Sequence, residues 1–132
     1  MELAVRLAMT MRPAEVLIFG GTGSRMDHTV ATLTVLDLLL TTKIPHVLVN
    51  ETNRIRLMGR GRTILKSGGE HTYVSVLPFT NQISLALSGF RYDSPKTTLV
   101  RGTTRGVSNE ISGRQAEITL YSGKAWVVES ND

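Results

Sequence analysis

The residues of this chain best suited to phosphate chemistry lie in one glycine-rich segment. It reads Gly20-Gly21-Thr22-Gly23-Ser24-Arg25-Met26-Asp27-His28, follows a short apolar run and precedes a helical pattern. Glycines at such a place let the backbone turn sharply and direct amide N–H groups at an anion near a helix N-terminus. Arg25 can hold a phosphate through two parallel hydrogen bonds, and Asp27 can bind a metal ion or orient a nucleophile.

Two familiar phosphate motifs are excluded for this segment. Met26 stands where the dinucleotide fingerprint requires its third glycine, and no Gly-Lys-Ser/Thr follows as a P-loop requires. One alternative stays open, in which the glycines only form a turn and Asp27 only caps the helix. The three histidines, His28, His46 and His71, have no metal-ligand spacing and are interpreted as structural.

A second polar segment lies later in the chain and reads Gly102-Thr103-Thr104-Arg105-Gly106-Val107-Ser108-Asn109-Glu110. It carries more glycine and more hydrogen-bonding side chains than a plain hairpin needs, although a polar loop between two strands is the simpler interpretation. Trp126 is the only tryptophan, and alternation along its strand places it on the same face as Val128. Core packing is the default expectation for it.

The first fifty residues alternate between helical and strand patterns. We expect helices over Glu2–Thr10 and Thr29–Leu40, each followed by a short apolar strand, over Val16–Phe19 and His46–Val49. This order predicts part of a parallel sheet covered by helices. Because two parallel strands are not stable by themselves, the α/β part is expected to be truncated on its N-terminal side.

From residue 51 the chain reads as short strands separated by turn residues such as Ser67-Gly68-Gly69 and Asp93-Ser94-Pro95. This spacing is typical of an antiparallel sandwich or barrel. The expected strands are Arg54–Met58, Thr63–Lys66, Tyr73–Leu77, Ile83–Leu87, Thr98–Arg101, Ala116–Tyr121 and Ala125–Glu129. The predicted fold class is therefore an α/β remnant, the strand-loop-helix of a parallel sheet, in residues 1–50, followed by an antiparallel β-sandwich in residues 51–132.

Composition limits the classes of function. The chain has 132 residues, 41% of them hydrophobic, and no cysteine, which excludes disulfides and thiolate metal sites. The 15 Lys and Arg against 11 Asp and Glu favour anionic partners. Because the arginines are dispersed and aromatic residues are few, nucleic acid is not an expected partner. No apolar run approaches a membrane span, so we expect a soluble, cytoplasmic protein without a membrane partner.

Taken together, the two polar segments resemble those of the thiamin pyrophosphokinases, which transfer diphosphate from ATP to thiamin. The first domain of that family ends in a strand, a Gly-x-x-Gly-x-Arg-x-Asp-His loop and a helix, matched here by Gly20, Gly23, Arg25, Asp27 and His28. The second domain is a β-sandwich with a Gly-x-Ser-Asn-Glu-like motif, matched here by Gly106, Ser108, Asn109 and Glu110. The resemblance covers the whole chain.

The resemblance implies a role for each segment. Residues 1–50 would be the C-terminal part of an ATP-binding catalytic domain, with Mg²⁺ as cofactor, and residues 51–132 a thiamin-binding sandwich. The implied catalytic residues are Arg25 and Asp27, the latter also a metal ligand, and the implied phosphate-binding residues are Gly20, Gly21, Gly23 and Arg25. Thiamin would be bound by Ser108 and Asn109, with Trp126 stacked on it. Family members are homodimers that share the thiamin site between subunits, so a homodimer is expected.

The chain also departs from the family pattern. Family members begin with a strand-rich segment whose acidic motifs hold magnesium and ATP and run into a Glu-Leu-Ala helix, whereas this chain starts at Met1-Glu2-Leu3-Ala4. We therefore expect it to correspond to the C-terminal two-thirds of such an enzyme and to be inactive alone. The alternative is a non-catalytic β-sandwich domain that binds thiamin or a nucleotide without turnover.

Overall fold

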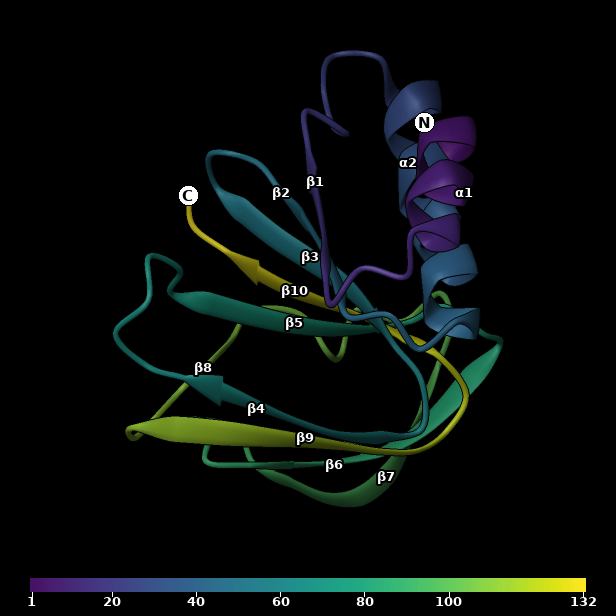
Figure 1. Ribbon diagram of the computed structural model, residues 1–132. Coiled ribbons are helices and arrows are strands. Elements are labelled where there is room, and N and C mark those ends of the chain that lie inside the picture. Colours follow the sequence, from purple (N-terminus) through teal and green to yellow (C-terminus); the bar gives the residue numbers. More distant parts are fainter. The chain divides into compact units, whose positions relative to one another are not determined.

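The computed structural model describes residues 1–132, which form two compact units, Met1–Leu57 and Met58–Asp132 (Figure 1). The first unit contains two helices and three short strands. These are α1 (Glu2–Thr10), β1 (Val16–Phe19), α2 (Met26–Thr41), β2 (His46–Val49) and most of β3 (Asn53–Met58). The bounds of α1, β1 and β2 are those predicted from the sequence. No helix of the chain is long and apolar enough to cross a membrane.

The sheet of the first unit places two strand ends side by side. β1 and β2 are parallel, from the Val16–His46 pair to the Phe19–Val49 pair, so both strands end at the same edge. β3 runs antiparallel to β2 through the Leu48–Ile55 pair, which gives this sheet a third strand. Figure 1 shows α1 and α2 next to each other on one side of β1 and β2. Buried Val5, Leu36 and Leu39 come from those helices, and buried Ile18, Val47 and Leu48 from the strands.

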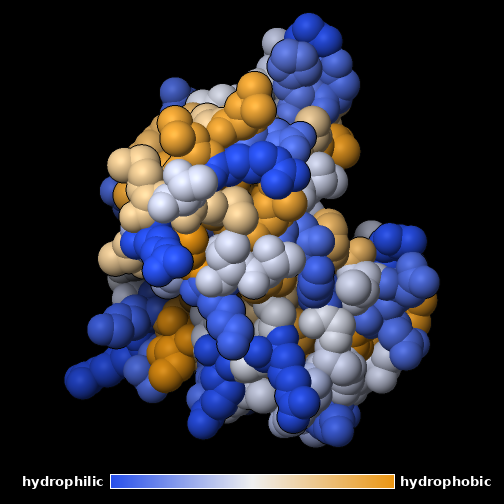
Figure 2. Space-filling model, turned by 45° about the vertical axis from the view of Figure 1, so that its right-hand side comes forward, coloured by the Kyte–Doolittle hydropathy of each residue, from blue (hydrophilic) through white to orange (hydrophobic).

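The first unit also leaves large hydrophobic side chains exposed. In and after α1, Leu3 is 84% exposed and Met11 is 74% exposed. On β1, Leu17 and Phe19 are exposed because alternation turns them away from buried Ile18. Figure 2 shows hydrophobic surface of this kind as orange patches in the upper half of the view. Apolar surface of this extent is typical of a region that contacts another element or another protein.

The second unit consists of two antiparallel sheets. One has the order β10-β5-β8, with β10 (Ala125–Ser130), β5 (Tyr73–Pro78) and β8 (Asn109–Glu110). The other has the order β4-β9-β6-β7, with β4 (Gly61–Lys66), β9 (Gln115–Ser122), β6 (Gln82–Ser88) and β7 (Ser94–Val100). Both sheets contribute alternate apolar side chains to one core, as Ala116, Ile118 and Leu120 do from β9. The predicted α/β remnant followed by an antiparallel β-sandwich is confirmed.

The largest differences from the predicted boundaries are at the starts of α2 and β7, and strands β3, β4, β5, β6, β9 and β10 differ from their predicted ends by one or two residues. α2 begins at Met26 rather than Thr29, because the end of the glycine-rich segment already has helical backbone. β7 begins at Ser94, although Ser94-Pro95 reads as a turn. β7 lies at the edge of its sheet, where a proline that lacks an N–H donor is tolerated.

Candidate functional site

The glycine-rich segment borders an open cavity at the carboxyl ends of β1 and β2. The cavity measures about 580 Å³ and is lined by Phe19, Gly20, Thr22, Val49, Asn50, Glu51 and Thr52. Asn50 Nδ2 donates a hydrogen bond of 2.8 Å to Thr22 Oγ1, which ties the ends of the two strands together. In open α/β sheets, ligands bind in the crevice outside the carboxyl ends of the strands. We refer to this cavity as the strand-end cavity.

The three glycines predicted to bind phosphate have different structural reasons to be glycine. Gly20 has a φ of +66°, in the left-handed region, and lines the strand-end cavity. A Cβ on Gly21 would lie 2.7 Å from Thr32 Cγ2 and 2.9 Å from Leu48 Cδ1, so this glycine allows close packing of the loop. A Cβ on Gly23 would meet nothing within 4 Å. Gly20 is therefore the glycine whose backbone faces the cavity.

Arg25 and Asp27, the predicted catalytic pair, form an ion pair with each other. Arg25 Nη2 lies 2.6 Å from Asp27 Oδ2, and Arg25 Nε lies 3.2 Å from Asp27 Oδ1. Both side chains are exposed, at 68% and 63%, and neither lines the strand-end cavity. The Arg25 guanidinium lowers the pKa of Asp27 below its ordinary value, with a smaller opposing contribution from burial. The N-cap of α2 is Arg25, so Asp27 lies within the first turn rather than at the cap.

Asp27 is also the predicted metal ligand, and its surroundings can be compared with what Mg²⁺ requires. Mg²⁺ binds oxygen ligands in octahedral geometry and is usually held by one or two carboxylates, phosphate oxygens and water. The chain contains no group of three or more His, Asp or Glu side chains that could hold a metal ion. Both Asp27 oxygens already accept hydrogen bonds from Arg25. The residues present do not form a complete Mg²⁺ site.

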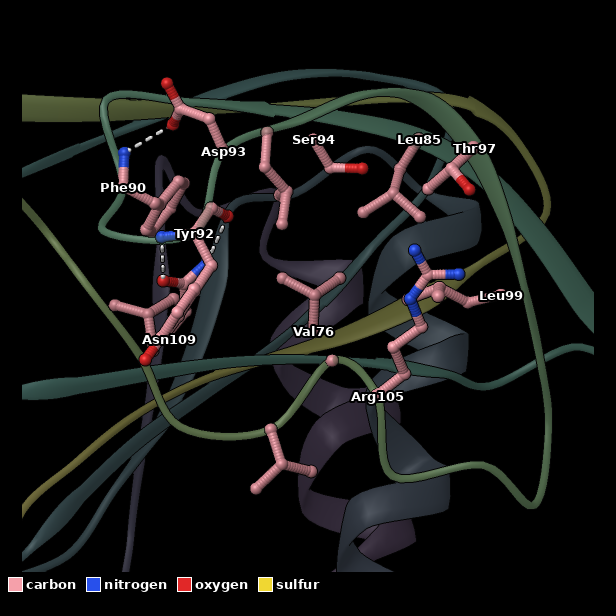
Figure 3. Close-up of a pocket in the computed structure, with 14 residues that line it drawn as sticks. Val76, Leu85, Phe90, Tyr92, Asp93, Ser94, Thr97, Leu99, Arg105 and Asn109 are labelled. Carbon is pink, nitrogen blue, oxygen red and sulfur yellow. Dashed lines mark hydrogen bonds between the residues drawn. The ribbon is translucent and has the colours of Figure 1, made fainter.

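The second polar segment closes one side of a cavity in the β-sandwich, which we call the sandwich pocket (Figure 3). The pocket has a volume of about 170 Å³. Its polar lining residues are Tyr92, Asp93, Ser94, Thr97, Arg105 and Asn109. Its apolar lining residues are Val74, Val76, Leu85, Leu87, Phe90, Leu99 and Val107, with Gly106 completing the wall.

Gly106 and Ser108 fasten this segment to β5. The amide N–H of Val76 donates to the carbonyl of Gly106 over 2.8 Å, and a Cβ on Gly106 would lie 2.1 Å from the Val76 carbonyl oxygen. The amide N–H of Ser108 donates to Ser75 Oγ over 3.0 Å. Ser108 makes this contact through its backbone, which has a φ of +58°. Its side chain is exposed and takes no part in the contact. Gly106 is required here by space, because no side chain fits between the segment and β5.

Asn109 and Glu110 hold the turn before β7. Asn109 is 8% exposed; its Oδ1 accepts from the Tyr92 amide over 3.0 Å, and its Nδ2 donates to the Tyr92 carbonyl over 2.9 Å. Arg91 Nη1 pairs with Glu110 Oε1 at 3.1 Å, and the Arg91 amide donates to the Glu110 carbonyl. One Asn109 N–H remains for another acceptor. Sequence reasoning missed this structural role, because the partners are 17 and 19 residues away.

Trp126, the third predicted thiamin contact, does not line the sandwich pocket. Its neighbours Ala125 and Val127 are fully buried, so alternation along β10 turns Trp126 to the strand face opposite the core. Its ring meets the Phe79 ring edge-to-face, with centroids 5.1 Å apart. The default expectation of core packing is therefore wrong for this residue.

Comparison with known proteins identifies relatives of the chain. Residues 62–124 match the family model described as thiamin pyrophosphokinase, vitamin B1 binding domain. The thiamine pyrophosphokinase of Bacillus subtilis is 28% identical over 133 residues, covering 100% of this chain and 62% of that protein. The resemblance to thiamin pyrophosphokinase is confirmed.

Solved structures of thiamin pyrophosphokinases show the same arrangement of elements. The crystal structure of the Bacillus subtilis enzyme matches with a TM-score of 0.95 and 28% identity, over 98% of this chain and 61% of that one. The crystal structure of thiamin pyrophosphokinase from Geobacillus thermodenitrificans matches with a TM-score of 0.90 and 24% identity, over 98% of this chain and 60% of that one. This second match shows that the two chains share a fold. The chain thus spans 61–62% of the length of the Bacillus subtilis thiamin pyrophosphokinase.

Proposed function

We propose that this chain supplies the thiamin-binding sandwich and part of the phosphate site of a thiamin pyrophosphokinase, an ATP-dependent transferase that forms thiamin diphosphate and AMP. The observation that carries this proposal is the match of residues 62–124 to the vitamin B1 binding domain of that family. The strand-end cavity beside Gly20 supports it, because a phosphate ligand is expected at the carboxyl ends of parallel strands.

In the proposed reaction the thiamin hydroxyl oxygen attacks the β-phosphorus of ATP. The bond between the β-phosphorus and the oxygen bridging to the α-phosphorus breaks, AMP leaves with that oxygen, and the hydroxyl proton passes to solvent. Positioning and neutralisation of charge dominate such a transfer. Arg25 would exchange its ion pair with Asp27 for the phosphate, at little cost because the pair is exposed. Mg²⁺ is the expected cofactor, although residues of this chain form no complete site for it.

For thiamin itself, Ser108 and Asn109 are the proposed contacts with the pyrimidine ring, and Trp126 is the proposed stacking partner. The exposed Ser108 side chain and the remaining Asn109 N–H support the first part of this assignment. Trp126 lies apart from the sandwich pocket, so its role rests on the family resemblance. From the same family resemblance we also propose that the protein is a cytoplasmic homodimer whose subunits share the thiamin site.

Thiamin-dependent release of AMP from Mg-ATP tests the proposed activity. The assay compares the 132-residue chain with the longest open reading frame that contains it in frame. We expect AMP only when thiamin is present, and Asp27→Asn to lose most of this activity. Glu15→Gln changes an exposed carboxylate of the same unit and serves as the control. Activity unaffected by Asp27→Asn would limit Asp27 to its ion pair with Arg25.

A non-catalytic thiamin-binding domain is the second candidate function. The lack of a three-ligand metal cluster and the pairing of Arg25 with Asp27 favour it for this chain taken alone. This second function would be supported if calorimetry detected thiamin binding while neither the 132-residue chain nor the longer reading-frame product formed AMP. Ser108→Ala and Ser108→Gly sharpen this measurement, because both remove the hydroxyl while only glycine relieves the positive φ. Equal loss of thiamin affinity in both variants would assign the effect to the hydroxyl.

A further inference from the structure

The sandwich pocket has the walls of an apolar ligand site. Val76, Leu85 and Leu99, which line it, are 2%, 0% and 6% exposed. Its volume of about 170 Å³ is close to the ~150 Å³ of an engineered apolar cavity that stays dry and binds benzene. A ligand body of about one aromatic ring therefore fits this space.

One cation at the pocket has no partner within the chain. Arg105 forms no hydrogen bond or ion pair with another residue, and Figure 3 shows its guanidinium beside Leu99 and Thr97. A guanidinium presents paired N–H donors that match a carboxylate. The Thr97 hydroxyl, which is also unpartnered, adds a donor at the same end. Asp93 lies at the opposite end of the pocket, where its Oδ1 accepts a hydrogen bond of 2.8 Å from the Phe90 amide.

We propose that the sandwich pocket is a binding site for a small organic monocarboxylate with a compact apolar body. The apolar body packs on Val76, Leu85 and Leu99, and the carboxylate pairs with Arg105. The site shares Asn109 with the proposed thiamin contacts but selects a ligand of opposite charge, because the positive charge of Arg105 opposes the thiazolium cation. Inorganic phosphate is also disfavoured, because Arg105 and Thr97 lie at one end and the apolar walls offer no hydrogen bonds to the phosphate oxygens that face them.

Three probes of one shape but different charge test this site on the full chain. Benzoate carries the carboxylate, benzamide is its neutral analogue and benzamidine is its cationic analogue. We expect benzoate to bind with a Kd of about 1 mM, as is usual for a ligand of this size in a small pocket. In amide NMR spectra the shifts should concentrate at Val76, Thr97 and Leu99. Benzamide should bind about tenfold more weakly, and benzamidine should not bind there.

Two arginine variants separate the pocket from general surface charge. Arg105→Gln should weaken benzoate binding about tenfold, because it removes charge-assisted hydrogen bonds. Arg101→Gln removes the same charge from the neighbouring turn and should leave the affinity unchanged. Thr97→Val preserves shape without the hydroxyl and should weaken binding about threefold. Dispersed amide spectra of each variant establish that it is folded.

Three results would overturn the proposal. The first is equal affinity for benzoate and benzamide, and the second is benzoate affinity unchanged by Arg105→Gln. The third is displacement of benzoate by thiamin in simple competition, which would make the pocket the thiamin site itself. Thiamin binding that leaves benzoate in place would support two separate sites.

Discussion

The side chain of Asn109 holds both backbone groups of Tyr92, accepting from its N–H over 3.0 Å and donating to its carbonyl over 2.9 Å. Asn109 is buried, and the two residues lie 17 positions apart. A single amide thus fixes the turn before β7 against β8. This pairing explains structurally why an asparagine follows Ser108.

Replacement of Asn109 by aspartate should destabilise the fold. The aspartate keeps an acceptor for the Tyr92 N–H but loses the donor to the Tyr92 carbonyl and buries a negative charge. We expect the free energy of unfolding to fall by about 3 kcal/mol, measured by urea denaturation. Glu110→Gln, which breaks only the exposed pair with Arg91, should change it by less than about 1 kcal/mol. Equal stability of both variants would show that the Asn109 donor contributes little.

Gly106 should tolerate no side chain, whereas Gly113 should. A Cβ at Gly106 would lie 2.1 Å from the backbone carbonyl oxygen of Val76, which cannot move without disturbing β5. Gly106→Ala is therefore expected to cost about 3 kcal/mol of unfolding free energy. A Cβ at Gly113 would meet nothing within 4 Å, and its φ is not positive. Gly113→Ala should be neutral or slightly stabilising in the same urea measurement.

The fold was largely predictable, because hydrophobic periodicity is a local property. The apolar runs Val16–Phe19 and His46–Val49 are strands with the predicted bounds. Local patterns did not reveal the two-residue strand β8, because Asn109-Glu110 has no apolar residue. They also missed the pairing of β3 with β2, since strand partners depend on the path of the chain.

The candidate site was predictable as a location but not as a set of contacts. The glycine-rich segment lies at the carboxyl end of β1, as its position between a strand and a helix predicts. The ion pair between Arg25 and Asp27 was not anticipated, although the two residues are only two positions apart in sequence. The role of Asn109 depends on Tyr92, which lies 17 positions away in the sequence and which only the folded chain brings near.

Gly20 and Gly23 should respond differently to alanine. Gly20 has a φ of +66°, a conformation that costs an L-residue about 1 kcal/mol or more, whereas the φ of Gly23 is not positive. Gly20→Ala should therefore lower the unfolding free energy by about 1 kcal/mol. Gly23→Ala should leave it within about 0.5 kcal/mol. Thermal unfolding of the two variants decides the matter, and a larger loss for Gly23→Ala would contradict the loop geometry.

The ion pair between Arg25 and Asp27 predicts a measurable pH dependence. Arg25 lowers the pKa of Asp27 in the folded chain, so the carboxylate stays ionised to a lower pH there than in the unfolded chain. The stabilisation from this pair is therefore present above the unfolded pKa and is lost as the pH falls through the folded pKa. Carboxylate NMR titration should place Asp27 below the ordinary range for aspartate. The pair is exposed, so added salt should weaken the shift.

Removal of the Arg25 charge should reverse this effect. In Arg25→Gln the largest cause of the lowered pKa is gone, and Asp27 should titrate closer to its ordinary value. Arg12→Gln removes the same charge from a residue that makes no contact with Asp27, and it should leave the titration unchanged. Equal shifts in the two variants would assign the lowered pKa to the net charge of the chain. A shift confined to Arg25→Gln would establish that the ion pair with Arg25 is what lowers the pKa of Asp27.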